Sequence, residues 1–210
     1  MKKNALIIVD VQNDFLPNGA LGVSQADEIL PLINQLIVLP FDVKVASQDW
    51  HPPHHCSFAS TWGKKHGEQI VIGNVRQTLW KDHCIQDSFG AEFSKALDAT
   101  HFDYIVHKGL NPNVDSYSTF FDNNKLRETG LEAYLHAKGV KDLYIAGLTT
   151  EYCVYYSVLD AVHLGFTAHV ILDACRGIEL NEGDVATAIK GMQDKGAEFL
   201  NTEQVVKRFS

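Results

Sequence analysis

The first side chains able to do chemistry are an acid at the end of an apolar segment and an acid–histidine pair. Asp10 interrupts the apolar segment Ala5–Val11, and a buried carboxylate persists only if it is paired or hydrogen-bonded. Its position alone is compatible with structural capping or with catalysis. Asp49 and His51 lie two residues apart, so an extended chain would place both on one side, where they suit a divalent metal. A third ligand could come from any of the histidines that follow, namely His54, His55, His66 or His83.

A lysine and a cysteine follow two later apolar segments. Lys108 could anchor a carboxylate or stabilise an anion, although most lysines face water. Cys153 falls near the first turn of a predicted helix, where the helix dipole favours the thiolate and lowers the thiol pKa. The N–H groups of that turn can hold an oxyanion. A buried, inert thiol is the alternative, and it suits the other three cysteines better, namely Cys56, Cys84 and Cys175.

The segments around these residues alternate in type, which predicts an α/β fold. Apolar runs predict strands at 5–11, 42–47, 104–107, 142–147 and 167–172, with a sixth at 198–200. Helical spacing and Gly or Pro stops predict helices at 27–39, 126–138, 152–164 and 183–195. The alternation predicts a three-layer α/β/α architecture with a central, mostly parallel sheet of five to six strands. Ligands of such sheets bind beyond the carboxyl ends of the strands, and the long irregular stretch 48–88 is typical of a functional loop.

Composition narrows the function classes. The chain has 210 residues and a net charge of −8, which favours one domain and argues against a nucleic-acid partner. It has no apolar run of the roughly 20 residues that span a bilayer, so we expect no membrane partner. The first apolar run is broken at Asp10, unlike a signal peptide, and a cytoplasmic location is expected. The four cysteines form no CxxC pair and are expected to be free thiols.

Five ordered segments carry a specific resemblance. They are ALIIVDVQNDFLPNGAL (5–21), ASQDWHPPHHCSFAS (46–60), LWKDHCIQ (79–86), HKGLNPNVDSYSTFFDN (107–123) and AGLTTEYCVYYSVLDA (146–161). Together they resemble the nicotinamidase family of the isochorismatase-like cysteine hydrolases over nearly the whole chain. The resemblance implies a single isochorismatase-like hydrolase domain, residues 1–210.

The resemblance also implies roles for particular residues. The catalytic triad would be Asp10, Lys108 and Cys153, and the metal ligands would be Asp49, His51 and His83. The position of a further ligand in some members is held here by Ser57, which would act through water, with His54 and His55 as other neighbours. A cis peptide bond between Leu148 and Thr149 would turn the Thr149 N–H toward the oxyanion held by Cys153. Phe15 and Trp80 would flank the substrate ring, and Tyr117 would line the pocket.

The activity implied by this resemblance is metal-assisted hydrolysis of nicotinamide to nicotinate and ammonia, through a covalent thioester, in NAD salvage. Pyrazinamide is expected to be a second substrate. Zinc is the first expectation for the metal, with iron or manganese also suited to an Asp/His set. A homo-oligomer is compatible with this class of enzyme. Alternatives are a related N-carbamoyl amide hydrolase, an isochorismatase that needs no cysteine, an inactive member, and a metal storage or sensor domain.

Overall fold

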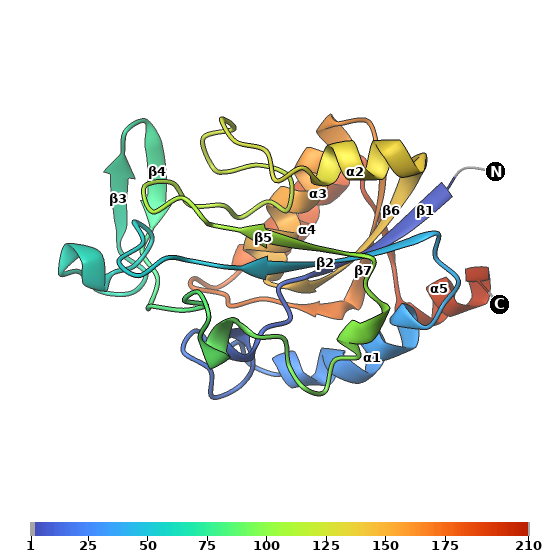
Figure 1. Ribbon diagram of the computed structural model, residues 1–210, viewed down its shortest axis with the longest axis horizontal. Helices are drawn as coiled ribbons and strands as arrows, with labels where there is room; N and C mark the ends of the chain where they lie inside the picture. Colours follow the sequence, from blue (N-terminus) through green and yellow to red (C-terminus); the bar gives the residue numbers. More distant parts are fainter. Residues whose placement is uncertain (1–2, 210) are drawn as a thin grey trace.

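The computed structural model describes residues 3–209 and contains one large parallel sheet between two helical layers (Figure 1). Within these residues the sheet has six strands in the order β5-β2-β1-β6-β7-β8, and all neighbouring pairs are parallel. This architecture confirms the predicted fold class. The strands are β1 (Lys3–Val9), β2 (Val43–Asp49), β5 (Tyr104–Lys108), β6 (Val140–Leu148), β7 (Thr167–Arg176) and β8 (Glu198–Leu200).

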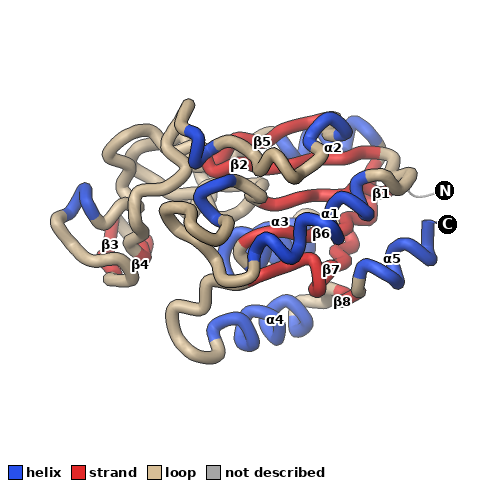
Figure 2. The backbone as a smooth tube through the Cα atoms, turned by 90° about the horizontal axis from the view of Figure 1, so that it is seen from below, coloured by secondary structure: helices blue, strands red, loops and turns tan. Residues whose placement is uncertain are grey.

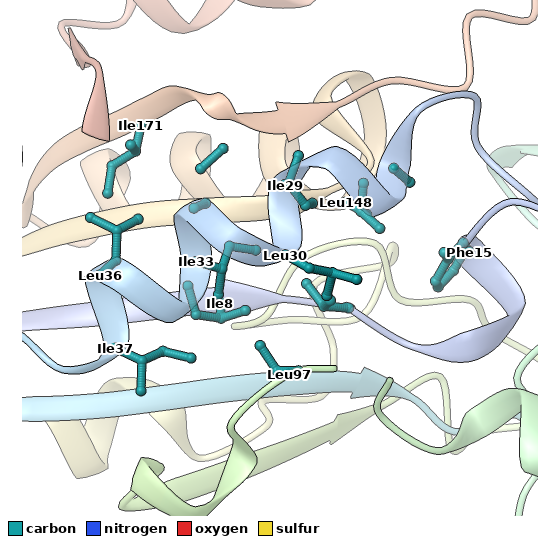
Figure 3. Packing of buried hydrophobic residues seen from close by; sticks show 14 of the residues in the cluster. Ile8, Phe15, Ile29, Leu30, Ile33, Leu36, Ile37, Leu97, Leu148 and Ile171 are labelled. Atoms are coloured by element: carbon teal, nitrogen blue, oxygen red, sulfur yellow. The ribbon is translucent and has the colours of Figure 1, made fainter. Parts of the chain in front are cut away.

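Helices cover both faces of this sheet. One face is covered by α1 (Ile29–Ile37) and α5 (Thr202–Phe209), and the other by α2 (Leu131–Lys138), α3 (Tyr155–His163) and α4 (Asp184–Asp194). Successive side chains of a strand point to opposite faces, so β1 supplies both apolar cores. Ile8 packs with Ile33 of α1 on one face (Figure 3), whereas Ile7 joins the core that contains Val158 of α3.

Parallel strands place their carboxyl ends along one edge of the sheet. In both views this edge faces the end of the molecule away from the two termini (Figures 1 and 2). Short 3-10 turns shape the loops there and nearby, at Asn13–Phe15, Ala26–Glu28, Ser60–Trp62 and Phe89–Ala91, and a further turn, Ala99–His101, precedes β5. The polar and nucleophilic residues that follow the strands can therefore come together at this edge.

The structure corrects the sequence prediction in three places. The stretch 48–88 is not wholly irregular, because β3 (Gln69–Ile72) and β4 (Val75–Thr78) form an antiparallel hairpin beside the main sheet. The predicted helix 126–138 starts only at Leu131, since Glu128 bridges Phe121 in an extended conformation. The helix α5 was not predicted, because it has only 8 residues and is separated by one residue from a strand of 3 residues.

The structure also bears on the state of the cysteines and on membrane-spanning helices. Cys56, Cys84, Cys153 and Cys175 are all buried free thiols, as predicted. Among residues 3–209, no helix combines the length and apolar character needed to cross a bilayer.

Candidate active site

Neighbouring strands bring four of the predicted residues together. Asp10 directly follows β1, and its backbone N–H donates to Ser47 of β2. Asp49 and Lys108 end β2 and β5 and are register partners. The strand on the other side of β1 is β6, which leads through Thr149 to Cys153. The strand order therefore makes close neighbours of residues that lie 39 to 143 positions apart in the chain.

Lys108 is a buried cation at the centre of this cluster. Its Nζ lies 2.8 Å from Asp10 Oδ2 and 3.3 Å from Cys153 Sγ, and it donates to Asp49 Oδ1. It also donates to the Ser116 carbonyl at 3.1 Å. Burial alone would lower the pKa of Lys108, but the negative charges of Asp10 and Asp49 outweigh it and hold the pKa well above its usual value. Lys108 is therefore charged at neutral pH.

Asp10 is a carboxylate beside the cysteine, with an oxygen within 4.8 Å of Cys153 Sγ. Ser47 Oγ donates to Asp10 Oδ1 at 2.7 Å. Oδ2 faces Lys108 and accepts no well-aligned hydrogen bond, so a lone pair remains for a proton. Burial raises the pKa of Asp10, against the opposing effect of Lys108. A carboxylate with a raised pKa is a better proton acceptor than one at the surface.

Cys153 lies in a one-turn π-helix, Thr150–Val154, that leads directly into α3 (Tyr155–His163). The thiol is buried, and burial raises its pKa well above the usual value, with Asp10 and Asp49 adding to the rise and Lys108 opposing it. The sequence prediction of a lowered pKa is therefore wrong for the free protein. The dipole of the helix terminus favours the thiolate, but burial and the two nearby carboxylates disfavour it and have the larger effect on the pKa. Cys153 thus needs a base, and Asp10 is placed to act as one.

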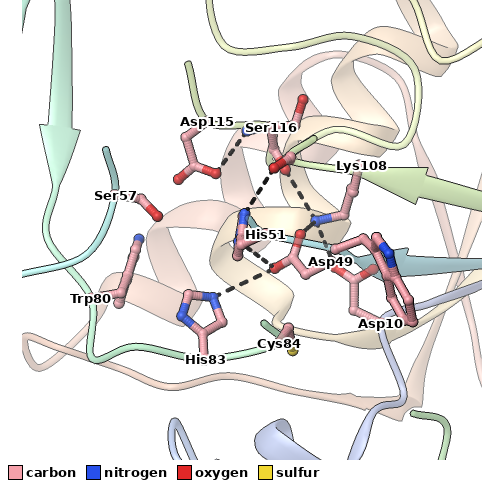
Figure 4. A network of polar contacts seen from close by, with 12 residues as sticks. Asp10, Asp49, His51, Ser57, Trp80, His83, Cys84, Lys108, Asp115 and Ser116 are labelled. Carbon is pink, nitrogen blue, oxygen red and sulfur yellow. Dashed lines mark hydrogen bonds and ion pairs between the residues drawn. The ribbon is translucent and has the colours of Figure 1, made fainter. Parts of the chain in front are cut away.

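Asp49, His51 and His83 form a set of ligands beside this cluster (Figure 4). Their ligand atoms lie within 4.8 Å of one another, and Asp49 Oδ2 is 3.7 Å from His51 Nε2 and 3.6 Å from His83 Nε2. The opposite ring nitrogens face the carbonyls of Gly109 at 3.1 Å and Lys81 at 2.8 Å. A carbonyl only accepts, so it holds the proton on Nδ1 and leaves the Nε2 lone pairs free to bind a metal. This donor set therefore fits a divalent metal ion.

Asp49 also joins the ligand set to the catalytic cluster, which the sequence did not reveal. Its Oδ1 faces Lys108 while its Oδ2 faces the two histidines (Figure 4). Burial would raise the pKa of Asp49, but Lys108 and His51 hold it well below its usual value. The Asp49 carboxylate thus contacts both the Lys108 ammonium group and the two ligand histidines.

A second group of possible ligands consists of His51, His55 and Asp115. Both ring nitrogens of His55 are engaged, Nδ1 with Ser57 Oγ at 2.7 Å and Nε2 with the Asn111 carbonyl at 2.9 Å. His55 stacks on His51 with ring centroids 4.2 Å apart. Ser57 and Asn111 thus hold the His55 ring in place, and the His55 ring in turn packs against His51. His54, the other neighbour left open by the sequence, is exposed.

A pocket of about 320 Å³, which includes its open mouth, connects the thiol with the ligand set. Trp80 donates through Nε1 to the Tyr117 hydroxyl at 3.1 Å and packs edge-on to Tyr152. The lining is mainly apolar and aromatic around a few polar groups, and comprises Phe15, Leu21, Asp49, His51, Trp80, His83, Asp115, Tyr117, Thr149, Tyr152, Cys153 and Ile178.

This combination of fold and strand-end residues agrees with one family. Residues 4–204 match the model described as the isochorismatase domain. The chain belongs to the isochorismatase family. A protein from Escherichia coli (strain K12) named nicotinamidase is 42% identical over 200 residues, covering 94% of each chain.

Two solved structures of isochorismatase-family relatives agree with the fold. An Acinetobacter baumanii nicotinamidase/pyrazinamidase has a TM-score of 0.94 and 41% identity, covering 98% of this chain and 99% of that one. A pyrazinamidase of Pyrococcus horikoshii in complex with zinc has a TM-score of 0.78 and 34% identity, covering 95% and 99%. The likeness extends over nearly the whole of each chain.

Of the catalytic, ligand and substrate residues expected from the sequence, all but Asp10 and Lys108 line this one pocket of the isochorismatase-family chain. Lys108 contacts Asp49 and Cys153 of the pocket wall, and Asp10 contacts Lys108. Phe15, Trp80, Tyr117 and Thr149 line the pocket beside the cysteine and the three expected ligands. The peptide bond between Leu148 and Thr149 is cis, as the resemblance implied. The roles of these residues in catalysis stay predictions.

Several residues of the pocket were not predicted from the sequence. Asp115 is buried there and accepts from Gln77 Nε2 at 3.0 Å, and Tyr152 and Ile178 complete the wall. An acid in a polar loop is usually solvated, so Asp115 gave no signal of burial. The resemblance segment 107–123 contains Asp115, but the resemblance gave roles only to Lys108 and Tyr117 within it.

Proposed function

We propose that this protein is a nicotinamidase that hydrolyses nicotinamide to nicotinate and ammonia. The observation that carries the proposal is one pocket lined both by the Cys153 thiol and by Asp49, His51 and His83. A ligand with a ring nitrogen and a carboxamide could therefore meet both groups at once. The similarity to nicotinamidases over nearly the whole chain supports this activity.

Covalent catalysis begins at Cys153, whose Sγ attacks the carboxamide carbon while Asp10 takes the thiol proton. The new C–S bond gives a tetrahedral intermediate, and its collapse breaks the C–N bond as Asp10 returns the proton to the leaving nitrogen. Ammonia departs and a thioester remains. Asp10 then takes a proton from water, the water oxygen attacks the thioester carbon, and the thiol is released with nicotinate.

Lys108 holds Asp10 ionised and close to the thiol through the 2.8 Å contact. It also stabilises the thiolate that forms 3.3 Å away. The backbone N–H groups of Thr149 and Cys153 would hold the developing oxyanion, and one such donor is typically worth about 3–4 kcal/mol in the transition state. Removing any member of this unit should therefore lower kcat strongly.

Asp49, His51 and His83 would hold one divalent metal ion, with zinc proposed first and iron or manganese as alternatives. When bound, the metal would offer an open position to the pyridine nitrogen and so orient the ring. Phe15 and Trp80 would supply apolar contacts to that ring. The role of the metal would be to orient the ring so that the carboxamide lies at the thiol, and not to activate water as hydroxide. We further propose that residues 1–210 form one such domain.

The decisive experiment measures ammonia release from nicotinamide by the purified protein, before and after removal of metal with a strong chelator. We expect turnover by metal-replete protein and its loss after chelation, with recovery when zinc is returned. Pyrazinamide should be hydrolysed and should compete with nicotinamide. Absence of turnover by metal-replete protein would contradict the activity. Full turnover without metal would leave the activity standing and contradict the role of the metal. An N-carbamoyl amide included as a parallel substrate would identify the related hydrolase instead.

A further inference from the structure

The segment that carries Cys153 is tied to the loop after β7 by a buried carboxylate. The strands β6 and β7 are neighbours, and Leu148 and Arg176 are register partners, so the segments that follow them emerge side by side. Glu151 lies in the π-helical turn two residues before Cys153. Its Oε1 accepts from the backbone N–H of Ile178 at 2.8 Å and of Glu179 at 2.6 Å. These two N–H groups follow the last residue of β7.

The contact is built into a closely packed environment. Glu151 is buried, and its second oxygen, Oε2, has no hydrogen-bond partner. A Cβ on Gly177 would meet Glu151 Oε2 at 2.8 Å and would collide with Val185, so only glycine leaves room for the carboxylate. Leaving a buried carboxylate oxygen without a partner is unfavourable. The arrangement indicates that holding the loop at Ile178 and Glu179 is the function of this side chain.

The loop held in this way supplies part of the pocket wall. Ile178 lines the pocket together with Cys153 and Tyr152, and it packs against the apolar core that contains Phe15. The loop is internally tied at its far end, where Glu179 accepts from the Gly183 N–H at 2.8 Å and Asp184 accepts from the Asn181 N–H at 2.9 Å. Glu151 is thus the link between this loop and the nucleophile turn.

We infer that Glu151 is a positioning residue that fixes Ile178 against the bound substrate relative to the thiol. It acts through Ile178 and takes no part in bond making, because Asp10 and Lys108 surround the sulfur atom. The inference rests on the proposed nicotinamidase activity for its substrate. The geometry also makes a prediction that does not depend on any activity, since the N–H groups of Ile178 and Glu179 should be protected from exchange.

The experiment compares Glu151→Ala with Glu151→Gln, which keeps Oε1 as an acceptor, and with Glu182→Ala, an exposed acid of the same loop. Amide hydrogen exchange at residues 178 and 179 should accelerate in Glu151→Ala alone. Loss of one apolar wall contact is worth on the order of tenfold in binding, so KM for nicotinamide should rise about tenfold in Glu151→Ala. Its kcat should stay within about threefold of the wild-type value, while Glu151→Gln and Glu182→Ala resemble the wild type.

A double-mutant cycle tests whether Glu151 acts through Ile178. Ile178→Ala should raise KM to a similar extent, and the double variant should be no worse than Glu151→Ala alone. Additive effects, or a fall in kcat at unchanged KM, would overturn the inference. If Glu151→Ala does not fold, Glu151→Asp, which is one methylene too short for both N–H groups, takes its place with the same expectations. A wild-type protein without turnover would contradict the proposed function, whereas unchanged amide exchange in the variant would contradict the anchoring.

Discussion

At the scale of the residue, the site depends on one cation shared among three groups. Lys108 faces Asp10, Asp49 and the thiol of Cys153, all of them buried. A single positive charge then favours the ionised forms of two carboxylates and of the thiolate that forms during the reaction. These groups titrate as a coupled unit, so the acid–base behaviour belongs to the cluster rather than to one side chain.

Replacing the nucleophile gives the first prediction. Cys153→Ala should lower kcat for nicotinamide by at least about 10³-fold, since covalent catalysis is lost while the pocket remains. Steady-state ammonia release measures the effect, and Cys175→Ala, another buried free thiol, should keep most of the activity. Wild-type rates in Cys153→Ala would exclude this residue as the nucleophile.

His55 gives a prediction for stability against pH. Burial and the neighbouring His51 lower the pKa of His55 to about 4, whereas the unfolded chain binds the proton near pH 6.5. The unfolded state therefore binds more protons between these values, and stability falls as the pH is lowered below about 6.5. Between pH 7 and pH 5 the loss from this group should be about 2 kcal/mol.

Urea unfolding of the metal-free protein at several pH values measures this effect. His55→Gln should be destabilised at pH 7 but should lose less stability than the wild type on going to pH 5. His54→Gln changes the exposed neighbour and should follow the wild-type dependence. A difference in the free energy of unfolding between wild type and His55→Gln that is the same at all pH values would contradict the prediction.

At the scale of the element, the turn that ends β5 supports both the lysine and a histidine ligand. Lys108 is the last residue of the strand, and the next residue, Gly109, has φ +68° and directs its carbonyl to His51 Nδ1. A Cβ on Gly109 would collide with the imidazole of His51. The turn thus requires glycine for its backbone conformation and for the approach of the ring.

Gly109→Ala should therefore disturb the ligand set more than the fold. The left-handed conformation costs about 1–2 kcal/mol for alanine, and displacement of the His51 ring should weaken metal affinity by about 10- to 100-fold. Gly63→Ala is the matched control, because Gly63 has φ +60° and nothing within 4 Å of the added Cβ. Zinc titration and thermal unfolding of both variants separate the two effects. Equal zinc affinity in the two variants would contradict this account of the turn.

At the scale of the whole molecule, strand order determines which distant residues meet. The order β5-β2-β1-β6 places Lys108, Asp49 and Asp10 at the carboxyl ends of three neighbouring strands, with the turn carrying Cys153 after the fourth. His83 comes instead from the loop that follows the β3–β4 hairpin, three residues after Trp80, and lies beside Asp49 and His51. Metal binding would therefore tie the sheet to its longest loop and stabilise the fold.

Metal addition should accordingly raise the thermal stability of the metal-free protein. At a free zinc concentration about 100-fold above Kd, linkage adds about 2.7 kcal/mol, or about 5–10 °C in Tm for a domain of this size. His83→Ala should lose most of this increase, whereas His54→Ala, an exposed histidine of the same loop region, should keep it. Calorimetric scans with and without zinc measure the shift, and equal shifts in the two variants would refute His83 as a ligand.

The α/β architecture and the residues at the strand ends could be predicted from the amino-acid sequence. Alternating apolar and amphipathic segments require a parallel sheet between helices, and Asp10, Lys108 and Cys153 were found because polar residues interrupt or follow apolar strands. The family-specific segments supplied the ligand set and the ring-flanking residues. These signals are local in the chain, so a single sequence contains them.

The effects of those residues on one another became apparent only from the packing of the assembled strands. Burial raises the pKa of Cys153 where a helix terminus alone would lower it, and Asp49 faces both Lys108 and the ligand histidines. Ile178 and Glu151 entered the site because β7 lies beside β6. Desolvation and contact depend on neighbours far away in the sequence, and those neighbours exist only once the strands have assembled.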